Sequence, residues 1–249
     1  MTDILPILII VLLLMPIASS DTIASEDSFN ASNLSAENRS WKAEEVFDFP
    51  DDHVLHQPQE VVTDSKLFAE WLYWTGILHD EETGKPYGIQ YTLFQMDLQP
   101  GLMAFINHVA ISDVYNSQHP FYGYSILPEQ ANITSGTDGN KGAYWRYEDN
   151  QTNLTYWSEL DYWNIETRGS ASVGGGKSQS ISMNLTIAND KADYHLQSPN
   201  GITELGTCLS IGSDAMAGRS YYYSHPAMTT SGTITIGRRT INVTGDSWF

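Results

Sequence analysis

Two ionisable side chains stand on segments that otherwise have the pattern of strands, Glu70 at the start of EWLYWTG and His108 within FINHVAISD. A carboxyl group and an imidazole in one apolar cavity could donate and accept a proton, because burial favours the neutral form of a carboxyl group. These two residues are the candidate catalytic pair. A histidine on a strand is also a common hydrogen-bonded core or rim residue, so a structural role for His108 stays open.

Other kinds of chemistry have less support. His53 and His56 follow Asp51 and Asp52, but the flanking prolines disfavour a helix that would align them as metal ligands. The segment GGGKS, residues 174–178, lacks the first glycine of a phosphate-binding loop and precedes a strand-like run rather than a helix. No G-x-S-x-G elbow marks a nucleophilic serine. The sequence therefore predicts neither a metal nor a cofactor.

Aromatic residues make up 12% of the chain and gather in pairs and triplets. A β core accounts for part of them, since aromatic rings favour strands. Neighbours on a strand point to opposite faces, so Tyr73 and Trp74 cannot both enter one core. A curled sheet whose lumen is lined by Tyr and Trp suits an elongated apolar ligand. The predicted ligand-binding residues are Trp71, Tyr73, Trp74, Gln90, Tyr91, Tyr221, Tyr222 and Tyr223.

The elements expected to position these side chains are short strands. Residues 179–188, QSISMNLTIA, alternate polar and apolar side chains, and residues 232–245, GTITIGRRTINVTG, have the pattern of a hairpin that turns at 237–239. No helical stripe follows the N-terminal region, so we predict an all-β antiparallel barrel or sandwich. Further strands are expected at 70–78, 86–97, 104–113, 142–148, 153–163 and 193–197.

The N-terminal region predicts export. Residues 4–17 form an apolar run that ends in small residues, as in a signal peptide, whereas Asp3 in place of a basic residue leaves an uncleaved membrane anchor open. Residues 21–45 are acidic and rich in Ser and Asn, as in a flexible spacer, and residues 46–249 form the predicted folded domain. Eight N-x-S/T sequons also favour an extracellular or cell-envelope location.

Charge and cysteine content exclude several classes of function. The chain has 249 residues, with 12 Lys+Arg against 30 Asp+Glu, and its formal net charge of −18 disfavours nucleic acid as a partner. Cys208 is the only cysteine, which rules out an intrachain disulfide.

Six motifs follow one another along the chain: EWLYWTG (70–76), YGIQYTLF (87–94), HVAISD (108–113), SYYYSHP (220–226), SGTITIG (231–237) and VTGDSW (243–248). In this order they resemble the carotenoid 1,2-hydratase family, also called hydroxyneurosporene synthases, and its AttH-like relatives. The resemblance spans residues 70–249. It implies a lipocalin-like β fold, normally of two successive domains with a ligand cavity, and relatives that add water across an isolated isoprenoid double bond.

The chain departs from the family pattern in two places that bear on activity. It ends at Phe249, where the family continues into a second domain, so we expect a domain truncated at its C-terminus and a missing C-terminal partner domain. The acid–base groups that the resemblance implies lie in H-x-W and Y-x-D patterns. The chain has no H-x-W, and its Y-x-D match, Tyr147-Glu148-Asp149, is expected in a solvated turn.

These observations predict an exported lipocalin-like domain that binds an apolar ligand of isoprenoid or polyene type. Hydratase chemistry is expected only if a second domain completes the site. The alternative is a non-catalytic ligand-binding or cell-surface interaction module. Membrane association through the N-terminal apolar segment is a further expectation.

Overall fold

The computed structural model describes residues 49, 51–56, 69–99, 102–172, 177–191, 193–197, 201–204 and 219–249. They belong to one compact unit, Trp41–Phe249. The expected signal or anchor, the expected spacer and Cys208 lie outside the described residues. Within those residues, no helix has the length and apolar character that crossing a bilayer requires.

One antiparallel sheet of eleven strands forms the described fold, which confirms the expected all-β class. The helical turns among the described residues are two short 3-10 segments, η3 (Asp51–His53) and η4 (Pro128–Gln130). The order across the sheet is β4-β3-β2-β1-β15-β14-β9-β8-β7-β6-β5. The strands are β1 Ala69–Asp80, β2 Pro86–Gln99, β3 Leu102–Asp113, β4 Phe121–Ile126, β5 Asn132–Asp138, β6 Gly142–Glu148, β7 Thr152–Trp157, β8 Tyr162–Ser172, β9 Ser178–Ala188, β14 Met228–Ile236 and β15 Arg239–Trp248.

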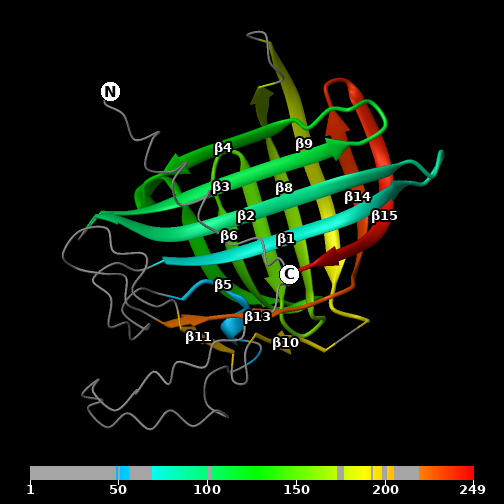
Figure 1. The fold of residues 1–249 in the computed structure, drawn as a ribbon. Coiled ribbons are helices and arrows are strands. Elements are labelled where there is room, and N and C mark those ends of the chain that lie inside the picture. The colour runs from blue at the N-terminus through cyan, green and yellow to red at the C-terminus, as the bar shows by residue number, and fades with distance from the viewer. Residues whose placement is uncertain are drawn as a thin grey trace, which may run out of the picture. The chain divides into compact units, whose positions relative to one another are not determined.

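Two short pairs of strands lie outside the large sheet. β10 (His195–Leu196) pairs with β13 (Tyr223–Ser224), and β11 (Ile202–Glu204) pairs with β12 (Arg219–Tyr221). In Figure 1, β10, β11 and β13 lie at one end of the large sheet, near the label of the C-terminus.

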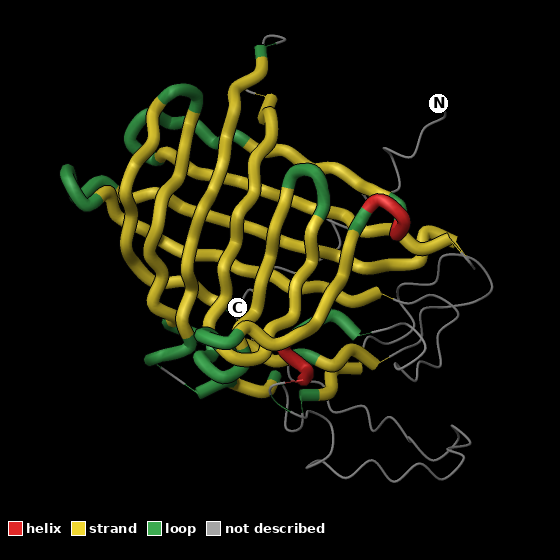
Figure 2. The backbone as a smooth tube through the Cα atoms, turned by 180° about the vertical axis from the view of Figure 1, so that it is seen from behind, coloured by secondary structure: helices red, strands yellow, loops and turns green. Residues whose placement is uncertain are grey.

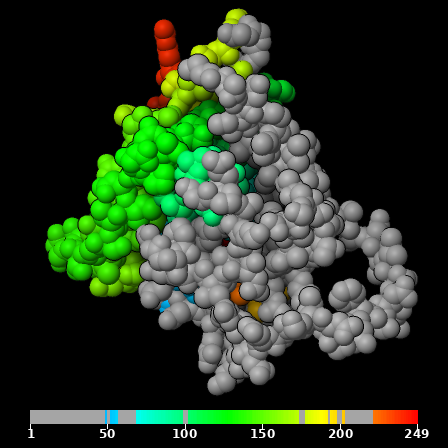
Figure 3. Space-filling view, turned by 90° about the vertical axis from the view of Figure 1, so that its left-hand side faces the viewer, coloured from blue at the N-terminus to red at the C-terminus, as the bar shows by residue number. Residues whose placement is uncertain are grey.

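The large sheet curls so that β1 to β4 cross over β8, β9 and β14 (Figures 1 and 2). β15 turns from one layer into the other, because it pairs with β1 on one side and with β14 on the other. The opposite side is joined by one residue pair, Phe121 of β4 with Ser172 of β8. In the space-filling view (Figure 3) the green segments, which belong to the middle of the chain, lie together on one side of the unit.

Alternation along the strands separates an inner face from an outer face. On β1, Leu72, Trp74 and Leu78 are buried in the core, whereas Ile77 and His79 are exposed. The expected placement of Tyr73 and Trp74 on opposite faces is therefore confirmed. Full burial of one large apolar side chain stabilises a fold by about 1.5–3 kcal/mol, so the inner face supplies the main favourable term.

Two glycines in the sequence motifs let neighbouring strands approach closely. A Cβ at Gly232 would overlap the carbonyl oxygen of Asn184, and a Cβ at Gly245 would overlap that of Ile77. Gly232 also has a φ of 144°, a conformation that L side chains rarely adopt. The motif glycines therefore fix the contacts of β14 with β9 and of β15 with β1.

Two details of the strand prediction are corrected by the structure. Residues 153–163 are not one strand, because a turn ends β7 at Trp157 and β8 begins at Tyr162. Asp161 in this turn has a φ of 47°, a left-handed conformation that Asp tolerates better than most residues. β4 and β5 were not predicted. The burial pattern of β5 is irregular and blurs a period of two, whereas β4 alternates but has only 6 residues and contains Gly123.

Candidate functional site

Rings from distant parts of the chain meet at one end of the interior. Trp163 on β8 lies with its ring centroid 4.8 Å from that of Trp74, 4.6 Å from that of Tyr156 and 6.1 Å from that of Phe249. The imidazole of His53 packs edge-on against Tyr156 at 5.5 Å. We call this group the aromatic end cluster, and its members are His53, Trp74, Tyr156, Trp163, Tyr223, His225 and Phe249.

The lead-in segment, residues 49 and 51–56, closes this end of the interior. Nδ1 of His53 lies 2.8 Å from the hydroxyl of Tyr223, which donates a hydrogen bond to the carbonyl oxygen of Asp52 at 3.1 Å. His53 and Leu55 are both buried, with exposed fractions of 4% and 5%. These contacts place the imidazole of His53 inside the aromatic end cluster.

His56 fastens the lead-in segment to β1. Its Nε2 lies 2.6 Å from a carboxylate oxygen of Asp52, its Nδ1 lies 2.6 Å from one of Glu70, and its backbone N–H donates to Glu70 at 2.8 Å. Gln95 on β2 donates to the carbonyl oxygen of His56 at 3.0 Å. The hydrogen bonds to Asp52 and then to Glu70 raise the pKa of His56 to about 10. Glu70 therefore serves as one partner of a charged imidazole.

We expect Glu70→Gln to lower the pKa of His56, because it removes one of the two carboxylates that stabilise the charged ring. A titration of the His56 ring protons by NMR measures the change, and Asp52→Asn should shift the pKa in the same direction. Replacement of Glu129, an exposed residue on η4, by Gln is the matched control and should leave His56 unchanged. An unaltered His56 titration in both Glu70→Gln and Asp52→Asn would contradict the pairing of His56 with these two carboxylates.

The other two histidines of this region are uncharged at neutral pH. Burial, with a smaller contribution from His225, lowers the pKa of His53 to about 4, against the opposing effects of Asp161 and Asp52. Burial also lowers the pKa of His225. A buried imidazole without a charge can donate at one nitrogen and accept at the other.

Buried polar atoms without hydrogen-bond partners gather around the aromatic end cluster. Within the described residues they are Nε1 of Trp74, both ring nitrogens of His225 and Oδ1 of Asn189. Asn189 borders the cluster because its amide group donates to Asp161 at 2.6 Å, and Tyr156 donates to the same carboxylate oxygen at 2.9 Å. Native proteins leave few such atoms unpaired, so this concentration at one end calls for an explanation.

A second polar network crosses the interior beside the aromatic end cluster, since the ring of Tyr91 stacks on that of Trp74 at 5.8 Å between centroids. Tyr91 donates to Asn107 at 2.9 Å, Asn107 donates to the hydroxyl of Tyr147 at 3.1 Å, and Tyr147 donates to Asp149 at 2.7 Å. Tyr147 is fully buried. The expectation of a solvated turn for the Y-x-D residues is therefore wrong for Tyr147, and Asp149 is half-buried at the base of the β6–β7 turn.

This network spans the seam between β4 and the opposite layer, where the strands lack a continuous series of backbone hydrogen bonds. The hydroxyl of Tyr124 on β4 donates to Asp149 at 2.9 Å and lies 2.8 Å from the hydroxyl of Thr152. Tyr122, also on β4, lies 2.7 Å from the hydroxyl of Thr167, and burial raises its pKa to about 12. Side-chain hydrogen bonds thus take the place of backbone pairing along the seam.

The structure divides the predicted site residues between two faces. Glu70, Trp74, Tyr91 and Tyr223 lie on the interior side, whereas Trp71, Tyr73, Gln90 and His108 lie on the outer face of β1 to β3. Tyr221 belongs to β12 and is exposed, and the backbone N–H of Tyr222 donates to Gly201 at 2.8 Å. Glu70 and His108 are not brought together, so the structure does not form the expected catalytic pair.

His108 has a packed environment of its own on the outer face. Its ring lies 5.4 Å from that of Phe94 and 5.5 Å from that of Phe121, and Gly123 leaves the space that the imidazole occupies. Burial lowers its pKa. An uncharged imidazole between two phenyl rings fits the structural role that the sequence left open.

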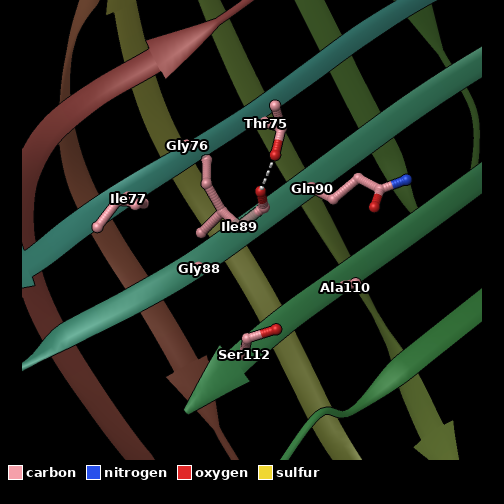
Figure 4. A pocket seen from close by; sticks show the side chains of 8 residues that line it. All are labelled: Thr75, Gly76, Ile77, Gly88, Ile89, Gln90, Ala110 and Ser112. Carbon is pink, nitrogen blue, oxygen red and sulfur yellow. Dashed lines mark hydrogen bonds between the residues drawn. The ribbon is translucent and has the colours of Figure 1, made fainter. Parts of the chain in front are cut away.

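The outer face also carries a shallow hollow of about 270 Å³ (Figure 4). Gly88 and Ala110 leave it open, and Gln90 and Ser112 point polar groups beside it. The hydroxyl of Thr75 donates to the carbonyl oxygen of Ile89 at its edge, at 3.2 Å. Of the predicted ligand-binding residues, Gln90 alone lines this hollow.

Comparisons with known proteins agree with this architecture. The family model described as AttH-like matches residues 40–249. The chain belongs to the AttH-like family. Among curated proteins, none matches this AttH-like chain.

A solved structure supports the fold of this AttH-like chain. The Nitrosomonas europaea protein NE1406, a candidate AttH whose crystal structure was solved at 2.00 Å resolution, shares 23% identity with a TM-score of 0.55. The match covers 81% of this chain and 53% of that one, so this chain spans about half the length of that protein. These comparisons do not show the carotenoid 1,2-hydratase activity that the resemblance of the motifs implies.

Sequence reasoning named Trp74 and Tyr223 of the aromatic end cluster as ligand-binding residues. It missed the other members, which are His53, Tyr156, Trp163, His225 and Phe249. His225 and Phe249 stand within or beside the motifs SYYYSHP and VTGDSW, and Trp74 stands in EWLYWTG. The backbones of His225 and Phe249 exchange two hydrogen bonds of 2.9 Å, so the residue that follows VTGDSW meets SYYYSHP in space. The motifs themselves were the signal, since three of them converge on one end of the interior.

Proposed function

We propose that this AttH-like chain binds an apolar small molecule at the aromatic end cluster, inside the curled sheet. The observation that carries the proposal is the group of buried polar atoms without partners on Trp74, His225 and Asn189. They lie among rings that offer large apolar area, and few convergent polar groups in an apolar lining are typical of ligand sites.

Access to this site requires the lead-in segment to move. Phe49 packs on His53 at 4.6 Å and on Tyr223 at 4.8 Å between ring centroids, and His53 packs on Tyr156. The ring contacts of the lead-in segment therefore occupy the end through which a ligand would reach the interior. We propose that the ligand takes the place of these rings.

Binding has more support within this chain than catalysis. Protonation of an isolated double bond needs a strong acid, whereas His53 is held uncharged and Glu70 is paired with His56. Asp149 accepts hydrogen bonds from Tyr124 and Tyr147, so its carboxylate is already engaged within the fold. We propose water addition to an isoprenoid only for a longer protein in which a second domain supplies the acid.

The cellular location of this function is a proposal from the sequence. The apolar run at residues 4–17 and the sequons favour an exported domain in the extracellular space or cell envelope. An apolar ligand that is sparingly soluble in water would there need a carrier.

Retinol, a fluorescent isoprenoid, tests binding in the full chain. We expect it to quench tryptophan fluorescence saturably and to raise the melting temperature, because a ligand that binds only the folded state stabilises it. Trp163→Leu should weaken binding by about tenfold or more, since it removes the central ring of the cluster.

The neighbouring residue supplies the control. Tyr162→Leu changes an aromatic residue on the outer face of the same strand and should leave the affinity within about twofold. Equal weakening in both variants, or no saturable binding, would reject the interior site. Without binding, an interaction module would be the better description.

A further inference from the structure

The unpaired polar atoms of the aromatic end cluster define what an occupant must offer. Nε1–H of Trp74 is a donor only, so it requires an electron-pair acceptor such as oxygen. An uncharged His225 can bond a hydroxyl group in either sense or donate to a carbonyl group. A pure hydrocarbon would leave each of these buried groups unpaired, which costs free energy that an oxygen-bearing ligand would not have to spend.

The charges around the cluster are negative. Asp161 acts on both His53 and His225, Asp52 acts on His53 and Asp193 acts on His225. In the described part of the chain, no Lys or Arg is among the charged groups that shift these two imidazoles. A ligand carboxylate would therefore be buried without a free cation, which is costly even after a protein relaxes.

The charged imidazole of His56 does not offset this negative field. It lies 2.6 Å from a carboxylate oxygen of Asp52 and 2.6 Å from one of Glu70, so its charge is already balanced by two acidic groups. The backbone carbonyl oxygen of Asp52 accepts a hydrogen bond from the hydroxyl of Tyr223, at the border of the cluster.

We infer that the interior site selects uncharged apolar ligands that carry a hydroxyl or carbonyl oxygen, and that it discriminates against carboxylic acids with the same carbon skeleton. The inference rests on the proposed function, since it names the ligand class of the same site. A ligand oxygen could make the hydrogen bonds that a buried water molecule can make there. The ligand would then add apolar contacts while the buried polar atoms keep hydrogen-bond partners.

Four retinoids with one carbon skeleton test this ligand class at pH 7.5: retinol, retinaldehyde, retinoic acid and the hydrocarbon axerophtene. We expect retinol and retinaldehyde to bind about tenfold tighter than the hydrocarbon, which corresponds to about 1.4 kcal/mol, one typical net hydrogen bond. Retinoic acid should bind more weakly than retinol by a similar or larger factor.

The outcomes separate this inference from the proposed function. Binding of all four compounds with equal affinity, or tightest binding of retinoic acid, would overturn the inference while the interior site stands. Saturable binding of none of them would overturn both. The comparison uses the unaltered chain and so does not depend on any variant folding.

A variant locates the preference in the cluster. His225→Phe keeps an aromatic ring and removes both nitrogens, so retinol affinity should fall about tenfold while the affinity for axerophtene stays within about twofold. His119→Phe, at an exposed position outside the cluster, should change neither affinity. An unchanged ratio of retinol to axerophtene affinity in folded His225→Phe would remove His225 from the proposal.

Discussion

Replacement of Asp149 by alanine is expected to lower the free energy of unfolding by about 3–5 kcal/mol. The side chain accepts hydrogen bonds from the hydroxyls of Tyr124 and Tyr147 and from the backbone N–H groups of Gln151 and Thr152, at 2.7–2.9 Å. Each hydrogen bond to a charged group contributes about 1.5–3 kcal/mol, and water can reach only part of a half-buried turn. Urea unfolding followed by circular dichroism measures the loss.

The position of Asp149 explains why the effect should be large. β4 and β8 share one backbone pair, so the hydroxyl network around Asp149 supplies much of the contact across the seam. Tyr124→Phe is the graded comparison, since it removes one donor and keeps the ring, and it should cost about 1–2 kcal/mol. A loss below about 1 kcal/mol in Asp149→Ala would show that the seam does not depend on this carboxylate.

A surface carboxylate in a similar turn provides the control for this prediction. Asp138 accepts hydrogen bonds from the backbone N–H groups of Asn140 and Lys141 at 2.9 and 3.0 Å, in a turn that is fully exposed. Asp138→Ala should therefore cost much less than Asp149→Ala. The difference isolates the contribution of the buried tyrosine hydroxyls.

Period-two patterns allowed most of the sheet to be predicted, because a half-buried strand alternates apolar residues on its inner face with polar residues on its outer face. Residues 179–188 and the 232–245 hairpin correspond to β9 and to the β14–β15 pair. The break between β7 and β8 was missed, because Tyr156-Trp157 and Tyr162-Trp163 give the interrupting turn an aromatic flank on each side. A strand pattern alone does not show that residues 158–161 reverse the chain, because Leu160 among them suits a strand as well as a turn.

The candidate site could be predicted less well, because its contacts join residues far apart in sequence. His53 meets Tyr223 across 170 positions, and His56 meets Glu70 through a segment without a regular period. Alternation placed Tyr73 and Trp74 on opposite faces, but it could not say which of the two faced the interior. The order of the motifs along the chain does not show which of these two residues faces the interior, because EWLYWTG and SYYYSHP come together only in the folded structure.

Acidification is expected to destabilise the closed end of the interior, with the loss governed by His53. Its pKa is lowered to about 4 in the folded chain, against about 6.5 when unfolded, so between these values the unfolded chain binds more protons. The contribution of uncharged His53 is therefore complete above pH 6.5 and is lost as the pH falls through 4, by on the order of 3 kcal/mol. The lowered pKa of His225 acts in the same direction.

The groups that face His53 set the size of this effect. Asp161 and Asp52 oppose it by stabilising the charged ring, His225 adds to it, and the hydroxyl of Tyr223 is uncharged throughout this range because burial raises its pKa. His56 opposes this slope only near pH 6.5, because the folded ring, with a pKa of about 10, is already charged there and only the unfolded chain takes up a proton. Urea unfolding at intervals between pH 7 and pH 4 measures the dependence.

His53→Phe separates this histidine from general acid denaturation. The variant keeps the ring contact with Tyr156 but cannot gain a proton, so its stability should fall less steeply between pH 6.5 and 4 than that of the unaltered chain. His195→Phe, at an exposed histidine on β10, should retain the full slope. Equal slopes in the unaltered chain and in His53→Phe would mean that the lead-in segment is not held by an uncharged imidazole, and the ring contacts alone would then have to keep this end closed.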